Sequence, residues 1–112
     1  MGKDKTELLQ GTLDLLVLKT VDTLGPLHGW AIAKRIEQVA EDLLELKYGT
    51  LYPALMRLEQ NGWISSEWGT SENNRRARFY SITKQGRKQL TREAENWEQM
   101  AAFITRVLGT SR

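Results

Sequence analysis

The sequence predicts a mainly α-helical fold with a small β-hairpin, and three observations carry that prediction. Residues 8–60 hold three stretches with apolar side chains at helical spacing, joined by short links. Two short stretches of strand character follow, on either side of a polar turn sequence. From residue 83 the helical pattern returns and continues almost to the end of the chain. This order predicts a winged helix-turn-helix followed by a long C-terminal dimerisation helix.

Length and composition predict one compact unit. With 112 residues, we expect a helix-turn-helix part at 1–83 and a dimerisation helix at 84–112. The composition, 40% hydrophobic and 27% charged, is that of a folded globular protein. The chain has no cysteine, no apolar run long enough to cross a bilayer and no secretory leader pattern. We therefore expect a cytoplasmic protein without a membrane partner.

The first two helices are predicted at residues 8–24 and from His28 onward. The first is apolar on more than one side, so it should be largely buried, and Gly25-Pro26 should end it. The second is amphipathic, and the lone histidine at its start favours a capping or packing role. Residues 1–7 are polar and are expected to form an arm that either offers Lys3 and Lys5 to phosphates or has no function.

The third helix is the element around which the chain is organised. Thr50 is the predicted N-cap, Pro53 should lie in the first turn where proline is tolerated, and Gly62 should end the helix in a left-handed conformation. One face carries an apolar stripe: Leu51, Ala54, Leu55 and Leu58. The opposite face begins with hydroxyl groups, which suit contact with a DNA groove.

Two strands are predicted at residues 63–68 and 77–82, with Tyr80 and Ile82 sharing one face. The intervening residues 69–76 are small, amide-bearing or polar, as turns prefer, and end in two arginines. A strand pair directly after a helix-turn-helix is a wing.

The last helix should start at the N-cap Thr83 and stop at Gly109. Its apolar residues alternate spacings of four and three, which is typical of a heptad seam between helices. We predict that this seam joins two copies of the chain, the alternative being that it packs only within its own chain. The seam consists of Leu90, Ala94, Trp97, Ala101, Ile104 and Leu108.

The net charge of +2 is small, but its distribution is uneven. Residues 11–46 carry three basic and six acidic side chains, whereas residues 47–92 carry nine basic and three acidic ones. Positive charge thus lies in and after the third helix, where phosphate contact would need it. Two solvated faces of different sign would explain the same asymmetry.

Three groups are predicted to bind DNA together. Tyr48, Thr50 and Tyr52 would enter the major groove, although Tyr52 could instead be a packing residue. Lys47 with the helix start would hold a phosphate. The third group lies along the DNA backbone or the minor groove and consists of Arg75, Arg76 and Arg78.

Arg57 is a weaker DNA-binding candidate, because it can pair with a carboxylate such as Glu59 or lie in solvent. No catalytic constellation is present. A single histidine without cysteine makes no ordinary zinc site, and neither a phosphate-binding glycine loop nor a nucleophile elbow occurs. We predict no enzyme activity, no metal and no cofactor.

These motifs resemble the PadR family of winged-helix transcriptional regulators across nearly the whole chain. The resemblance is carried by the run of residues 48–55 (YGTLYPAL), by RLE at 57–59 and by GWI at 62–64. Upstream, GTL at 11–13 and LHGW at 27–30 also match, with Trp30 where the family commonly has Tyr. Downstream, YSIT at 80–83 and Gly86 match as well. The single C-terminal helix resembles the short type of the family, which argues against a large preformed effector pocket.

The resemblance implies a homodimeric repressor that binds a pseudo-palindromic DNA operator. It also implies release by a small aromatic effector at the dimer interface, contacting Trp97, Met100 and Phe103, although Trp97 could simply pack there. The alternative function is a winged-helix protein-protein interaction module without specific DNA binding. A small enzyme is a further alternative, which the missing acid-base and metal groups disfavour.

Overall fold

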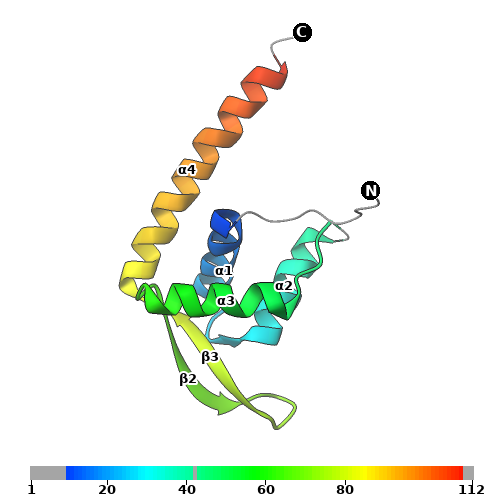
Figure 1. The fold of residues 1–112 in the computed structure, drawn as a ribbon, viewed down its shortest axis with the longest axis vertical. Helices are drawn as coiled ribbons and strands as arrows, with labels where there is room; N and C mark the ends of the chain where they lie inside the picture. Colours follow the sequence, from blue (N-terminus) through cyan, green and yellow to red (C-terminus); the bar gives the residue numbers. More distant parts are fainter. Residues whose placement is uncertain (1–9, 42, 110–112) are drawn as a thin grey trace.

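The computed structural model describes residues 10–41 and 43–109, so the N-terminal arm with Lys3 and Lys5 lies outside the described residues. Four helices and a three-stranded antiparallel sheet follow one another along this part of the chain (Figure 1). The elements are α1 (Gln10–Leu24), β1 (Leu27–His28), α2 (Gly29–Ala40), α3 (Tyr48–Gln60), β2 (Ile64–Thr70), β3 (Arg76–Ile82) and α4 (Lys84–Gly109). This architecture confirms the predicted fold class.

The start of α3 differs from the prediction, since Thr50 is not its N-cap. The helix begins at Tyr48 because the Lys47 carbonyl already accepts the amides of Thr50 (3.0 Å) and Leu51 (2.9 Å). Lys47 is the N-cap residue and makes no side-chain capping bond. Pro53 therefore lies in the second turn, where its missing N–H removes one helical hydrogen bond.

Two other predicted helix ends are confirmed. Gly62 has φ +78°, a left-handed conformation that favours glycine. Thr83 caps α4, because its Oγ1 accepts the amide of Gly86 at 2.9 Å. Gly86 itself lies so close to the residue before β2 that an added Cβ would stand 1.9 Å from the Trp63 carbonyl oxygen. The wing is thus tied directly to the start of α4.

The sheet contains one strand that the sequence did not predict. β1 pairs with β3 through Leu27 opposite Tyr80 and His28 opposite Phe79, giving the order β1-β3-β2. A two-residue strand is too short to show an alternating pattern, which explains why it was missed. Its effect is to hold the start of α2 against the hairpin.

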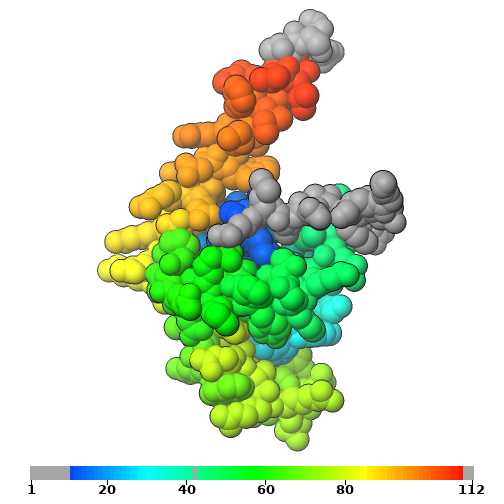
Figure 2. Space-filling view, in the orientation of Figure 1, coloured from blue at the N-terminus to red at the C-terminus, as the bar shows by residue number. Residues whose placement is uncertain are grey.

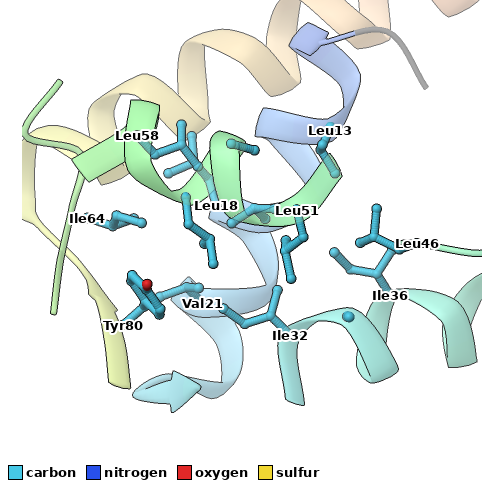
Figure 3. Close-up of a cluster of buried hydrophobic side chains, with 14 of the residues drawn as sticks. Leu13, Leu18, Val21, Ile32, Ile36, Leu46, Leu51, Leu58, Ile64 and Tyr80 are labelled. Carbon is cyan, nitrogen blue, oxygen red and sulfur yellow. The ribbon is translucent and has the colours of Figure 1, made fainter. Parts of the chain in front are cut away.

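The core lies where α1, α2, α3 and the inner end of the hairpin meet (Figure 3). The predicted stripe of α3 is fully buried there, facing Val17, Leu18 and Val21 of α1 and Ile32 of α2. Each leucine, isoleucine or valine among these side chains contributes roughly 1.5–3 kcal/mol when removed from water. Tyr80 closes the core on the sheet side and is 6% exposed.

A partly buried ion pair joins α1 and α3 beside this core. Arg57 Nη2 donates to Asp14 Oδ1, and the two side chains are 31% and 9% exposed. Of the two alternatives to DNA contact for Arg57, pairing with a carboxylate is the one that the structure shows. The partner is Asp14 rather than Glu59. The contact joins residues 43 positions apart, which no local pattern can reveal.

Among the described residues, it is the first turns of α4 that pack on the rest of the chain. Leu90 belongs to the core, and Arg87 Nε lies 3.3 Å from Asp22 Oδ1 on α1. Beyond this contact the helix projects away from the body, at the end of the molecule opposite the hairpin (Figure 2). In the described part of the chain no helix is both long enough and apolar enough to traverse a lipid bilayer.

Candidate nucleic-acid interface

The first turns of α3 present two tyrosines side by side. Tyr48 is 45% and Tyr52 43% exposed, and their ring centroids lie 5.6 Å apart. Lys47 and Thr50 are exposed next to them. The geometry agrees with both interpretations of Tyr52, because its ring packs on the backbone of α2 while nearly half of the side chain remains accessible.

The contact between Tyr52 and α2 depends on a glycine. A Cβ added at Gly29 would stand 2.5 Å from the Tyr52 hydroxyl oxygen. Partial burial, with a smaller contribution from neighbouring Tyr48, raises the pKa of the Tyr52 phenol above 10.0. At neutral pH this hydroxyl is therefore neutral, able to donate one hydrogen bond and to accept others.

His28 connects α2 to the tip of the wing. Its Nδ1 accepts the amide of Ala31 at 3.3 Å, which confirms the capping role predicted for this residue. Its Nε2 lies 3.6 Å from Glu72 Oε1 in the hairpin loop, and its ring meets Phe79 edge-on at 5.3 Å. The pKa of Glu72 is lowered, first by the glutamate's own backbone amide and then by His28.

Arg76 and Arg78 of the wing lie on one face of the hairpin together with Trp68. In the β2–β3 register, Trp68 stands opposite Arg78 and Thr70 opposite Arg76. Side chains alternate along a strand, so Arg76 and Arg78 share the face that carries Tyr80 further inward. The guanidinium carbon of Arg76 lies 4.7 Å from the Trp68 ring centroid, and that of Arg78 lies 5.1 Å from it.

Arg78 is also connected to the end of α3. Its Nε donates to Ser66 Oγ at 3.0 Å, and Ser66 Oγ donates to Glu59 Oε2 at 2.7 Å. One Arg78 terminal nitrogen lies 4.0 Å from the same Glu59 oxygen. Burial, then the charge of Glu59, raises the pKa of nearby Tyr80 above 10.0.

Several of these groups line one hollow of about 590 Å³ between the start of α2, α3 and the wing. The hollow brings Tyr52 together with all three predicted wing arginines, whereas Lys47, Tyr48 and Thr50 are not part of its lining. In Figure 1 the hairpin extends beyond α3 on the side away from the free end of α4. The lining consists of His28, Gly29, Trp30, Tyr52, Trp68, Ser71, Asn73, Arg75, Arg76, Ala77, Arg78 and Tyr80.

Trp68 and Trp30 are site residues that the sequence reasoning missed. Trp30 is exposed at the start of α2, with Lys34 Nζ 5.7 Å from its ring centroid. Both indoles line the hollow. Alternation along each strand places Trp68 on one face of β2 and Arg76 with Arg78 on one face of β3. Only the register between the two strands shows that these side chains meet.

The predicted dimer seam divides into two parts in the structure. Leu90 is buried in the core of its own chain, and Ala94 and Ala101 are half-buried. Trp97, Ile104 and Leu108 are exposed, as are the proposed effector contacts Met100 and Phe103. Leu90 therefore packs within its own subunit, so the exposed apolar face begins after it.

Within residues 10–41 and 43–109, no group of three or more histidine, cysteine, aspartate or glutamate side chains could hold a metal ion. The hollow instead combines phenol, indole and guanidinium groups. Such groups bind phosphate oxygens and stack on flat or charged partners.

Comparison with known proteins gives consistent matches over most of the chain. The family described as "Transcriptional regulator PadR-like family" matches residues 17–92. A transcriptional regulator from Clostridium thermocellum is 34% identical with a TM-score of 0.77, and the match covers 87% of this chain and 93% of that one. A PadR family transcriptional regulator from Eggerthella lenta is 28% identical with a TM-score of 0.76, covering 90% and 85%. An uncharacterized 37.1 kDa protein in a transposon of Streptomyces fradiae is 39% identical over 80 residues, which span 71% of this chain and 21% of that protein.

Proposed function

The chain belongs to the PadR-like family of transcriptional regulators, and from this premise we propose that it is a homodimeric repressor that binds a pseudo-palindromic operator. In this proposal it acts in the cytoplasm on double-stranded DNA, without enzymatic activity. The start of α3 reads bases in the major groove, and the wing arginines contact the neighbouring backbone.

One observation carries the proposal: Tyr52 of α3 and Arg75, Arg76 and Arg78 of the wing line the same hollow. A surface that reads DNA needs groups able to contact base edges beside groups able to contact phosphates. Here a neutral phenol and three guanidinium groups converge from two elements. Lys47, at the start of α3, extends the positive charge along the same helix end.

Dimerisation through α4 completes the proposal. Trp97, Met100, Phe103 and Ile104 are each about half exposed, on a helix that leaves the body of its own subunit. Burying such residues against a second copy would stabilise both helices. A two-fold dimer would place its two α3 helices at half-sites about one helical turn of DNA apart.

Repression would follow from occupation of the operator. A flat aromatic effector between the α4 helices, in contact with Trp97, Met100 and Phe103, would release the DNA by changing the distance between the two α3 helices. If Trp97 only packs against its counterpart, the protein represses without this effector.

The competing function is a protein-interaction module that uses the same hairpin and helix. The two functions differ in their response to salt, because phosphate contacts release counterions and so weaken steeply as salt rises. A protein partner held mainly by apolar contacts would show little salt dependence.

The test combines two variants with a duplex selected from a random pool. Tyr52→Ala should weaken binding to the selected duplex while the dimer persists. Arg75→Ala with Arg76→Ala should weaken binding to all duplexes by roughly 60-fold at 0.1 M salt and lower the salt slope by about 1.8, if each arginine neutralises one phosphate.

The matched control is Lys88→Ala with Arg92→Ala, which removes the same charge from exposed positions on α4. The control should leave affinity within about threefold of the unmodified chain. Equal losses of affinity in both double variants would contradict a specific role for the wing, because net charge alone would then explain the binding.

A further inference from the structure

Trp68 is an exposed indole whose neighbours are charged. It is 55% exposed, although it lies on the face of β2 that begins with the buried Ile64. The core-facing side of the hairpin thus continues outward into the solvent, and there the side chains against Trp68 are Arg76 and Arg78. More than half of the Trp68 side chain is therefore not packed in the core, and its indole contacts two cationic groups.

The guanidinium carbons of Arg76 and Arg78 lie 4.7 and 5.1 Å from the centroid of the indole, within the range of a cation–π interaction. An arginine lying over an aromatic ring interacts through its planar face, while its five N–H donors lie in the plane and point outward. Those donors can still form paired hydrogen bonds with phosphate oxygens. A stacked arginine therefore remains competent to bind DNA.

Stacking also lowers the entropy cost of binding. A free arginine side chain loses much conformational freedom when it is fixed on a phosphate, and a side chain already held in place loses less. Arg78 has a second restraint, because Ser66 and Glu59 hold its Nε side. For Arg76, the interaction seen within residues 10–41 and 43–109 is with the indole.

We propose that Trp68 is a positioning residue of the DNA-facing surface, whose indole holds Arg76 and Arg78 in the orientation that meets the phosphates of one DNA strand. The proposal rests on the DNA-binding function proposed above. It adds an uncharged aromatic side chain to the residues that set affinity, and this side chain acts through the two arginines.

The test compares two replacements of Trp68, one that keeps an aromatic ring and one that does not. Trp68→Leu keeps an apolar side chain but removes the π-face, and Trp68→Phe keeps a ring. We expect the leucine variant to bind a labelled mixed-sequence duplex of about 30 base pairs roughly fivefold to tenfold more weakly. The phenylalanine variant should recover most of that loss. Ser65→Ala, on the same strand but the opposite face, is the matched control and should bind like the unmodified chain.

The salt slope separates positioning from any direct interaction of the indole with DNA. If Trp68 acts through the arginines, Trp68→Leu should lower the slope by up to about 0.9 for each phosphate that is no longer neutralised. It should also add less than about twofold to the weakening already caused by Arg76→Ala with Arg78→Ala, because the two changes remove the same interaction. An unchanged slope with fully additive effects would overturn the proposal.

Failure of this inference is distinguishable from failure of the proposed function. If Arg76→Ala with Arg78→Ala weakens binding but Trp68→Leu binds like the unmodified chain, DNA binding stands and the role of Trp68 falls. If the unmodified chain binds the duplex without salt dependence, both proposals fall. Thermal melts of each variant confirm that the compared proteins are folded.

Discussion

Replacing Asp14 by Asn tests how α3 is held against α1. The change keeps the size of the side chain and removes the negative charge that faces Arg57. The guanidinium would then lose the ion-pair partner that it has among the described residues, and its Nε is already buried without a hydrogen bond there. The variant therefore leaves a largely buried positive charge uncompensated.

The expected loss in the free energy of unfolding follows from how deeply the ion pair is buried. Breaking a fully buried ion pair by removing one partner costs about 3–5 kcal/mol, and breaking a fully exposed one costs about 0–1 kcal/mol. With Asp14 9% and Arg57 31% exposed at the side chain, we expect a loss of about 2 kcal/mol. For a chain of this size that corresponds to a fall in Tm of roughly 8 °C.

The assay is thermal unfolding followed by circular dichroism at fixed protein concentration. Asp22→Asn is the matched control, because Asp22 pairs with Arg87, whose side chain is 64% exposed. The control should lower the Tm by no more than about 4 °C. Equal shifts for the two variants, or a shift below about 2 °C for Asp14→Asn, would refute the argument from burial.

Three further predictions concern other parts of the molecule. Gly86→Ala should destabilise the fold by about 3 kcal/mol in urea unfolding, since its Cβ would meet the Trp63 carbonyl at 1.9 Å. Gly11→Ala should be nearly neutral, because among the described residues no atom outside its own helix backbone and chain neighbours lies within 4 Å of the added Cβ. Phe103→Glu should convert the proposed dimer to monomers in analytical ultracentrifugation, and a persistent dimer would exclude α4 as the interface. Burial raises the phenol pKa of Tyr52 and Tyr80 in the folded state, so the folded protein binds these protons more tightly than the unfolded chain. Their contribution to stability is therefore fully present below pH 10.0 and should be lost as pH rises through the folded pKa. An absorbance titration of the folded protein in which every phenol ionises near pH 10.0 would contradict the last prediction.

The features predictable from sequence were those encoded within a few residues of one another. Gly62 and Thr83 set helix ends through their own conformation or hydrogen bonds, and the stripe of α3 follows from helical spacing. Thr50 shows the limit of such reasoning. It is a good capping residue in general, but the backbone turns into the helix earlier, at Lys47.

The features that the sequence concealed all depend on contacts between distant segments. Asp14 and Arg57 meet only when α1 and α3 pack, and β1 exists only because β3 lies beside it. Trp68 acquires its arginine neighbours through strand register, which shifts every side chain to the other face if it slips by one residue. Local propensity carries none of this information.

Site-directed cleavage tests most directly whether the wing faces DNA while α4 does not. The chain has no cysteine, so Asn73→Cys at the wing and Thr105→Cys on α4 each provide a single attachment point for an iron chelate. We predict that the chelate at position 73 cuts the bound duplex on both sides of the operator centre and that the chelate at position 105 cuts little. Strong cleavage from position 105 with none from position 73 would contradict the proposed orientation on DNA.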